Sequence, residues 1–457
     1  SNLGFPIDNN GDSCQKYIFF FCTVALSLAM PRLSSQVIVG FVFQRFVHRQ
    51  KYFPRVVGTM QTMNYIFMVL LVIGLWRPVH WQPGWKTYLY NSYGWFLMFV
   101  MIIGIISQFI AWMMSIDNIE EFASNSFTLL TMMLDYGKGL NILTRRGEII
   151  ELTNVLQQTP FAPRSEKEYA IQRKFDKSIL YIFQRFVTLC YGSLVCSCLT
   201  IVTLRSLVHD LPRRALPYQA WFPFEFYESL LGYSFAYTSQ IMTISTGSII
   251  GIAFDSLLPA LMLQTCAQLN ILKQRFHEMP SLLPGNARIY EKVQELNSSI
   301  STSESKLLAE CVRHHLDIFK FAKSLNDIFS YMIFLQCVVS TAVLCLCLFQ
   351  LSKLEISSTE FSSLFSYMVV MSVQIFIYCF YGCRVTLASL ALGDAIYEID
   401  WPSLSLPTQR SLLTIMARTL IPIRFISGHV VTLNLESFNS LIKLSYSTYN
   451  VLKQSRQ

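Results

Sequence analysis

Three ionisable residues, Asp135, Lys138 and Asp255, lie in stretches that are otherwise apolar enough for a membrane. A charge at membrane depth is costly unless it is paired or faces water. Asp135 and Lys138 are one helical turn apart, which favours a local ion pair over a proton relay. Asp255 lies four residues before Pro259. Its position predicts a buried, hydrogen-bonded carboxylate with a structural or gating role rather than a role in transport.

A second polar feature is the last stretch of the chain, Leu433–Gln457, which is long enough to cross a bilayer but too polar to face lipid alone. Helical spacing gathers one polar stripe, made of Glu436, Ser440, Lys443, Ser447, Asn450 or Val451, and Gln454. The opposite side carries Leu435, Phe438, Leu441, Ile442 and Leu452. We expect this helix to line a watery path together with partner helices. The alternatives are a helix lying on a membrane surface and a soluble helix that packs by one face.

Aromatic, thioether and hydroxyl side chains gather in the outer halves of four predicted spans. The candidates are Phe127, Leu130, Tyr191, Ser193, Ser197, Tyr233, Tyr237, Ile241, Tyr367 and Met371. Small-ligand pockets are mostly apolar with a few polar groups, so this set suits an uncharged volatile ligand. Ordinary helix–helix packing is the alternative, because Tyr and Ser are common there as well. The loop at 205–228, rich in Pro and aromatic residues, is either a cap over such a pocket or an interfacial aromatic belt.

Enzyme and cofactor signatures are missing from the sequence. It contains no P-loop, no H-E-x-x-H, no Gly-x-Ser-x-Gly and no Gly-rich dinucleotide turn. The twelve Cys include no C-x-x-C pair and lie mostly in apolar runs, and the seven His are scattered. We therefore expect a protein that is not an enzyme, with free thiols and with neither a metal nor a cofactor.

The composition is that of an all-α, polytopic membrane protein. The chain of 457 residues is 53% hydrophobic and 14% charged, with a mean hydropathy of +0.40, whereas soluble domains are about 25% charged. The apolar runs at 17–30 and 63–76 are short, which favours interfacial or re-entrant segments. Longer spans are predicted at 93–114, 120–143, 179–204, 230–276, 329–351 and 361–392, and the helical pattern of the fifth begins early, near 306, outside the membrane. A seventh element follows, split by Gly and Pro into 408–425 and 433–457.

The distribution of basic residues predicts the orientation in the membrane. The segments 138–177, 273–323 and 384–424 hold twenty Lys and Arg, whereas the segments on the opposite side hold six. The positive-inside rule then places the large loops and the N-terminus in the cytoplasm and the C-terminus outside. This orientation is the reverse of a G-protein-coupled receptor, and the Asp-Arg-Tyr and Asn-Pro-x-x-Tyr motifs of that class are missing too. A secondary transporter would show internal repeats, and none is visible.

Several short motifs, from about residue 60 to the end, resemble insect odorant receptors. They are Gly74-Leu75-Trp76, Leu211-Pro212 with 216–226 (LPYQAWFPFEF), Leu392–Ala395, Tyr397, Trp401, Arg418 with Pro422, and Ser445–Ser447 with Tyr449. A related gustatory channel remains an alternative. However, Thr448-Tyr449 is followed by 450–454 (NVLKQ), which breaks the ending typical of gustatory receptors, and the polar last helix is more typical of a ligand-tuned subunit than of the shared co-receptor.

The resemblance implies a seven-helix subunit of an odorant-gated, non-selective cation channel. In this family four subunits assemble, usually with a shared co-receptor, in the plasma membrane of sensory neuron dendrites. The implied regions are an N-terminal extension at 1–60, a channel domain at 61–457, a cytoplasmic anchor at 265–325 and 394–425, and a pore helix at 430–455. The implied pore and gate residues are Ser447, Val451, Leu452, Gln454 and Ser455.

Overall fold

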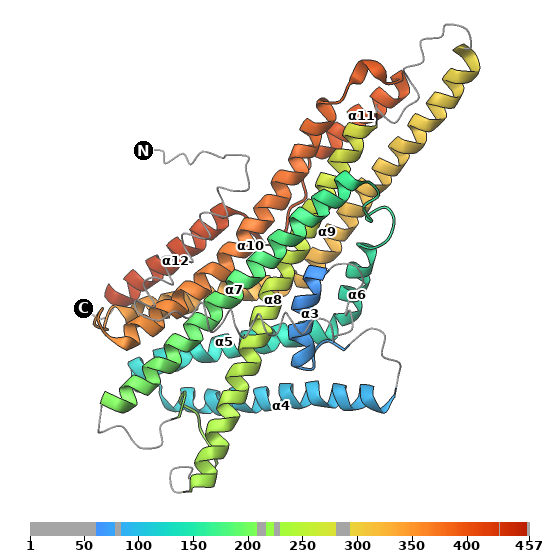
Figure 1. Ribbon diagram of the computed structural model, residues 1–457. Coiled ribbons are helices and arrows are strands. Elements are labelled where there is room, and N and C mark those ends of the chain that lie inside the picture. The colour runs from blue at the N-terminus through green and yellow to red at the C-terminus, as the bar shows by residue number, and fades with distance from the viewer. Residues whose placement is uncertain are drawn as a thin grey trace.

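The protein is a bundle of long helices with one short β-hairpin, as seen in a computed structural model that describes residues 61–77, 84–207, 216–223, 229–279, 293–428 and 430–454. The helices run obliquely, with α11 and the start of α9 at one end and α4 near the other (Figure 1). In chain order the elements are α3 (Gln61–Val72), α4 (Trp85–Met114), α5 (Ile119–Thr144), α6 (Arg146–Val155), α7 (Glu166–Leu207), α8 (Leu230–Glu278), α9 (Val293–Leu351), α10 (Thr359–Tyr397), η3 (Trp401–Ser403), α11 (Leu406–Thr419), β1 (Ile426–Ser427), β2 (Val431–Thr432) and α12 (Leu435–Gln454).

Helix α8 is the centre of the bundle. It packs against α3, α4, α5, α7, α9 and α10, and 94% of its most apolar segment is buried, compared with 28% for α4. A helix that is apolar on every side belongs in the interior, and Leu257, Leu258 and Leu261 of α8 are fully buried. Trp95 and Phe99 of α4 are exposed, so α4 presents an apolar outer face of the kind that lipid covers.

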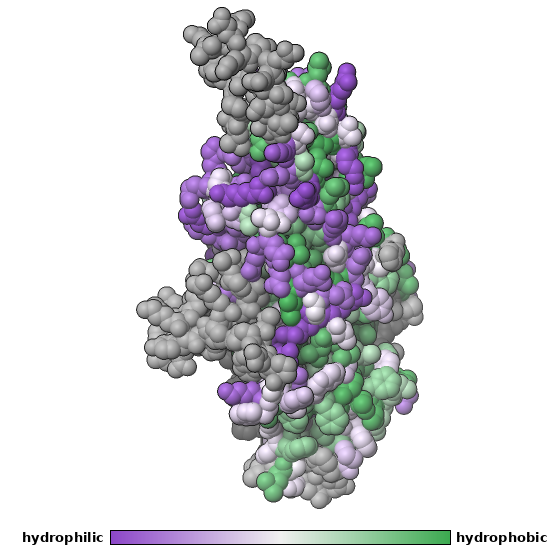
Figure 2. Space-filling view, turned by 90° about the vertical axis from the view of Figure 1, so that its right-hand side faces the viewer, coloured by the Kyte–Doolittle hydropathy of each residue, from purple (hydrophilic) through white to green (hydrophobic). Residues whose placement is uncertain are grey.

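Four of the described helices, α4, α8, α9 and α10, are long and apolar enough to cross a membrane. α5, α7 and α12 are more polar. α8 has 49 residues and α9 has 59, or about 70 and 90 Å at 1.5 Å per residue, so both extend well beyond a hydrocarbon core of about 30 Å. Figure 2 shows hydrophilic side chains over one half of the visible face and hydrophobic ones over the other. The long helices therefore join an apolar half to a water-exposed half.

The predicted spans fall on helices throughout, but α9 begins at Val293, before the helical pattern predicted from 306, and α7 begins early as well. This helix begins at Glu166 rather than at 179, because acidic Glu166 and Glu168 favour a helix N-terminus and extend it beyond the apolar run. The run at 63–76 forms α3 and then a turn in which Gly74 has a φ of +76°. The run at 17–30 lies outside the described residues.

The predicted split of the last element is confirmed, and a hairpin separates its two halves. β1 and β2 pair antiparallel between α11 and α12. Gly428 at the turn has a φ of +56°, and its N–H donates a hydrogen bond of 2.9 Å to Ser330 Oγ of α9. A Cβ at Gly428 would lie 2.6 Å from the Phe334 ring, so only glycine fits here without a shift. The hairpin thus seats the start of α12 on α9.

Candidate functional site

Helix α12 has one packed face and one polar face. Phe438 meets the Phe376 ring of α10 at 5.4 Å and 74°, and Leu441 and Ile442 pack on the core. Ser445 is 2% exposed and donates a hydrogen bond to the Leu441 carbonyl. The exposed side chains of the predicted stripe are Glu436, Ser440, Lys443, Ser447, Val451 and Gln454. Ser445, which the stripe does not include, is the polar residue that α12 turns inward.

Three details of α12 differ from the expectation or lie beyond it. Leu435, expected on the packed side, is 39% exposed because it occupies the first turn of the helix, where the chain leaves the hairpin. The predicted stripe left Asn450 and Val451 as alternatives for one position. Asn450 is half-buried and Val451 is exposed, so Val451 is the one that faces outward. The side chain of Leu452 and all of Ser455 lie outside the described part of the chain.

The start of α12 is fixed by a cap and by a close helix approach. Asn434 Oδ1 accepts a hydrogen bond of 2.7 Å from the Ser437 N–H, which satisfies one of the free donors at the helix N-terminus. Gly382 of α10 lies directly against the chain entering α12. A Cβ there would be 2.6 Å from Leu433 Cβ. The Gly382 contact joins the start of α12 to α10.

Five of the ten predicted pocket residues lie where α5, α7 and α10 face one another. The Phe127 and Tyr367 rings are 5.4 Å apart at 45°, and Met371, one turn along α10, is 2% exposed. Leu130 of α5 packs on the core beside them. Ser193 of α7 shares a hydrogen bond of 3.1 Å with a hydroxyl of α10. This group is an apolar contact region with a few hydroxyl groups.

The other predicted pocket residues take different places. Tyr233 and Tyr237 of α8 lie ring to ring at 5.9 Å, and Ile241 is 39% exposed. The next turns of α8 pack on α4, where a Cβ at Gly104 would lie 2.7 Å from Thr243 Oγ1. Tyr191 of α7 is 41% exposed. The backbone of Ser197 is helical, but its side chain lies outside what the structure describes.

Two hydroxyl partners in this region escaped the sequence analysis. The Tyr367 hydroxyl hydrogen-bonds to the Thr131 hydroxyl of α5, and Ser366 Oγ is the partner of Ser193. Thr131 lies one helical turn after Phe127, so i+4 spacing was the available signal. The loop also joins the site, because Asn125 donates a hydrogen bond of 2.7 Å to Gln219 Oε1.

A buried polar network lies deeper on the same helices. Lys138 Nζ is 2.8 Å from Asp255 Oδ1 and 3.5 Å from Asp135 Oδ1. Gln374 and Tyr378 of α10 donate hydrogen bonds to the Asp255 carboxylate at 2.8 and 2.5 Å. The expected local pair is therefore present, but the shorter contact of Lys138 runs to Asp255 of α8. The expectation of a buried, hydrogen-bonded Asp255 is confirmed, and its carboxylate joins α5, α8 and α10.

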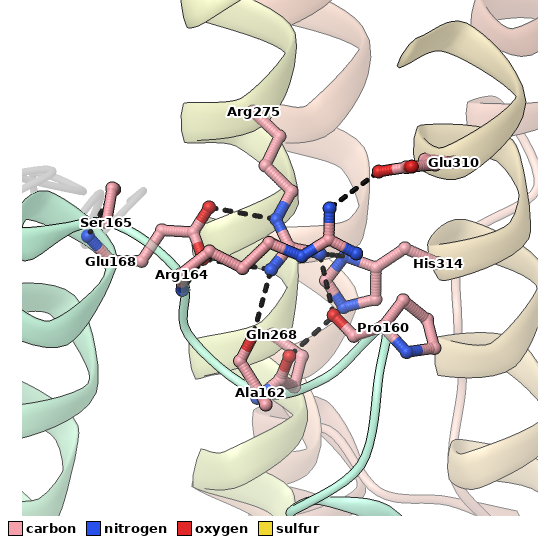
Figure 3. A network of polar contacts seen from close by, with 9 residues as sticks. All are labelled: Pro160, Ala162, Arg164, Ser165, Glu168, Gln268, Arg275, Glu310 and His314. Carbon is pink, nitrogen blue, oxygen red and sulfur yellow. Dashed lines mark hydrogen bonds and ion pairs between the residues drawn. The ribbon is translucent and has the colours of Figure 1, made fainter. Parts of the chain in front are cut away.

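A second polar network lies in the water-exposed half, around Arg275 of α8 (Figure 3). Its guanidinium donates to both oxygens of Glu168 at 2.9 Å. It also donates to the carbonyl oxygens of Pro160 and Ala162 at 2.6 and 3.2 Å. The fifth acceptor atom is His314 Nδ1 of α9, at 3.0 Å. One side chain thus ties α7, α8, α9 and the loop before α7 into a rigid unit.

The hydrogen bonds fix the tautomer of His314 in this network. Because Nδ1 accepts from Arg275, Nε2 carries the proton and donates to Gln268 Oε1 at 3.0 Å. Burial, together with the positive charges of Arg275 and Arg164, lowers the pKa of His314 to about 2. His314 therefore stays neutral at physiological pH and acts as a structural hydrogen-bonding group.

Within the described residues, no group of His, Cys, Asp and Glu side chains is arranged to hold a metal ion. The arrangement comprises an apolar contact region with hydroxyls, a buried charge network on the same helices, and a polar helix that packs on α10.

Comparisons with known proteins agree with this architecture. The family model described as "7tm Odorant receptor" matches residues 118–446. Odorant receptor Or1 of Anopheles gambiae is 25% identical over 402 residues, covering 84% of this chain and 93% of the relative. Odorant receptor 2a of Drosophila melanogaster is 22% identical over 406 residues, covering 87% and 98%.

Among solved structures, the olfactory receptor OR5 of Machilis hrabei in complex with eugenol shares the fold. The TM-score is 0.70 at 16% identity, over 90% of this chain and 99% of that one. The family match spans well over half of the chain, from α5 into α12, and its members are receptors rather than enzymes. This chain belongs to the seven-transmembrane odorant receptor family of insects.

Proposed function

We propose that this odorant receptor is a subunit of an odorant-gated, non-selective cation channel in which α12 lines a central pore. One observation carries the proposal: α12 packs on α9 and α10 by one face and leaves Glu436, Ser440, Lys443, Ser447 and Gln454 exposed on the other. Polar groups at membrane depth require protein or water beside them. Three further chains around a shared axis would supply that environment.

The ligand of this proposal is a small, volatile, largely apolar molecule with a polar group. The solved relative binds eugenol, and the region around Phe127, Thr131 and Tyr367 offers aromatic faces and hydroxyls. Odorant contacts that differ between closed and open arrangements would shift an existing equilibrium toward the open one. Tyr191, Tyr233, Tyr237, Ile241 and Ser197 extend the candidate site.

In this proposal the subunit sits in the plasma membrane of a sensory neuron dendrite, with the N-terminus inside and the C-terminus outside. The excess of basic residues in 138–177, 273–323 and 384–424 supports that orientation. Residues 61–457 form the channel domain, and 1–60 form an extension. The segments 265–325 and 394–425 serve as the cytoplasmic anchor, a role supported by the Arg275 network and by the length of α8 and α9.

The pore assignment is tested by thiol accessibility. Ser447→Cys places a thiol on the exposed face of α12, whereas Ser445→Cys places one on the buried face two residues away. We expect a charged methanethiosulfonate reagent, applied outside to open channels, to change the current of S447C and to leave S445C like the parent chain. Equal modification of both variants, or of neither, contradicts a pore-lining face.

The partner is tested by expression with and without the shared co-receptor, against an odorant panel. We expect robust odorant currents from the co-expressed pair and labelling of a C-terminal epitope on intact cells. Labelling of that epitope only after permeabilisation contradicts the proposed orientation.

A further inference from the structure

Two arginines, Arg77 and Arg146, lie side by side where α3 ends and α6 begins. The Arg146 guanidinium donates a hydrogen bond of 2.6 Å to the Arg77 carbonyl oxygen, and its central carbon lies 5.4 Å from the centre of the Trp76 ring. Trp76 is fully buried and stacks on Phe67 at 4.3 Å. The two cations and the indole therefore share one half-buried corner of the protein.

This corner contains hydrogen-bond donors that no acceptor satisfies. Among the described residues, the Nε–H groups of Arg77 and Arg146 and the Nε1–H of Trp76 are buried without a partner. Leaving a buried donor unpaired destabilises a folded protein, and more strongly so for a charged group. Three such donors in one place are unusual in a folded protein, so the corner is incomplete as the chain alone forms it.

The charges in the corner are unbalanced as well. In the described part of the chain, no carboxylate lies within 4 Å of Arg77 or Arg146, whereas the neighbouring Arg145 pairs with Glu148 at 2.9 Å. Burial and the positive charge of Arg77 lower the pKa of Arg146. Nearby like charges are tolerated when an anion stands between or beside them, because it turns repulsion into two attractions.

The location adds a further constraint. Tyr90 of α4 donates hydrogen bonds to the carbonyl oxygens of Leu71 and Trp76, at 2.7 and 3.1 Å, and so holds the turn against α4. Just before it on α4, Trp85 and Tyr88 are more than two-thirds exposed. Exposed Trp and Tyr at the end of an apolar helix are typical of the headgroup level of a membrane. The arginine corner is therefore at the depth where lipid phosphates lie.

We propose that Arg77, Arg146 and Trp76 form a binding site for a phosphate group carried by an anionic lipid headgroup. A phosphate monoester has three terminal oxygens that can accept hydrogen bonds from guanidinium and indole N–H groups, and guanidinium–phosphate pairs are among the strong hydrogen bonds in proteins. Occupancy would balance the two charges and fasten α3 to α6. The same chemistry is also offered by a soluble phosphate, so the test separates the two sources.

The test uses the purified full-length chain and measures its thermal stability by fluorescence-detected size exclusion. One arm adds phosphatidylcholine vesicles with or without phosphatidylinositol 4-phosphate, and the other adds inorganic phosphate or soluble inositol trisphosphate. We expect stabilisation by the phosphoinositide vesicles. Arg77→Gln and Arg146→Gln should each raise the phosphoinositide concentration required for this stabilisation about tenfold, since one charge-assisted hydrogen bond is lost.

Arg145→Gln is the matched control, because Arg145 is adjacent in sequence, equally basic and already paired. It should bind like the parent chain. Trp76→Phe keeps the stacked ring, removes only the indole donor and tests the site without a loss of charge. Stabilisation by soluble inositol trisphosphate alone would assign the site to a free phosphate. The proposal would be overturned if R77Q, R146Q and W76F all bound the phosphoinositide vesicles as the parent chain does. It would also be overturned if R145Q lost as much binding as R77Q and R146Q.

Discussion

Tyr378 of α10 donates a hydrogen bond of 2.5 Å to Asp255 of α8, which at the same time contacts Lys138 of α5. A single buried carboxylate thus holds three helices at one depth. Two of these helices also carry the Thr131–Tyr367 hydroxyl pair, and α10 continues to the contact of Phe376 with α12. The network therefore lies on α10 at the same level as the contact of that helix with α12, one to three turns from Tyr367.

Changing Lys138 to Met should destabilise the protein strongly. Removing one partner of a buried ion pair costs about 3–5 kcal/mol, because an uncompensated charge stays behind. We expect a clear fall in melting temperature for K138M. When Asp255→Asn is added to K138M, the double variant should lose less stability than the sum of the losses in the two single variants. Lys320→Gln, which breaks an exposed pair with Asp317, is the control and should change stability by at most about 1 kcal/mol. Additive effects of K138M and D255N would contradict a shared network.

Gly382→Ala should disturb the coupling of α10 to α12. Its new Cβ would meet Leu433 Cβ and O at 2.6 Å, and the overlap must be relieved by moving the start of α12. We expect a loss of about 1–3 kcal/mol in stability and an altered fraction of channels open without odorant, measured as basal current at matched surface expression. Gly147→Ala in α6 meets open space and should leave both quantities unchanged. A G382A channel with unchanged basal current would show that this contact does not control α12.

Tyr367→Phe should reduce odorant sensitivity while leaving surface expression intact. The change keeps the ring contact with Phe127 and removes only the hydroxyl. Thr131 retains its hydrogen bond of 2.8 Å to the Phe127 carbonyl oxygen, so the helix itself is not disturbed. For an odorant that hydrogen-bonds to the Tyr367 hydroxyl, one bond of about 0.5–1.5 kcal/mol corresponds to a shift of about two- to tenfold in the half-maximal concentration.

Tyr237→Phe serves as the comparison, since Tyr237 lies on α8 beside Tyr233. A shift for Y367F alone would confine the hydroxyl contact to the α5–α10 part of the candidate set. A shift for Y237F alone would move that contact to α8, and unchanged curves for both would remove both hydroxyls from the site.

Hydropathy patterns were sufficient to predict the helices, because a membrane span is a long, local signal. The over-long α8 and α9 were visible for the same reason, and the split of the last element followed from Pro422 and Gly428. The Lys138–Asp255 contact was not predictable, since the two residues are 117 positions apart and only the helix packing brings them together. The exposure of Leu435 and the burial of Ser445 likewise depend on how the hairpin positions α12 against α9.

Within the candidate odorant site, the sequence identified residue types but not their grouping. Phe127 and Tyr367 come from helices whose relative rotation no local pattern specifies, and Tyr233 and Tyr237 looked equivalent to them by composition alone. The corner of Arg77 and Arg146 was hidden for another reason. Each arginine resembles an ordinary loop cation until the structure shows that neither has a carboxylate partner among the described residues.

Lowering the pH should weaken the water-exposed half of the bundle through His314. Its pKa is about 2 in the folded protein and 6.5 in an ordinary setting, so the unfolded chain takes up a proton that the native chain refuses. The stability that this histidine contributes is complete above pH 6.5 and is lost as the pH falls below that value. Between pH 7.5 and 5, the free energy of unfolding should drop by about 2 kcal/mol from this group.

The measurement is the melting temperature of the parent chain and of His314→Gln at several pH values. Gln keeps an acceptor for Arg275 and a donor for Gln268, the two partners of the imidazole, but it does not titrate. The H314Q protein should therefore lose less stability on acidification than the parent chain. His277→Gln on α8, whose side chain is exposed, is the control, and its melting temperature should fall with pH as that of the parent chain does. Parallel pH curves for the parent chain and H314Q would show that His314 is not the group that makes the Arg275 network sensitive to acid.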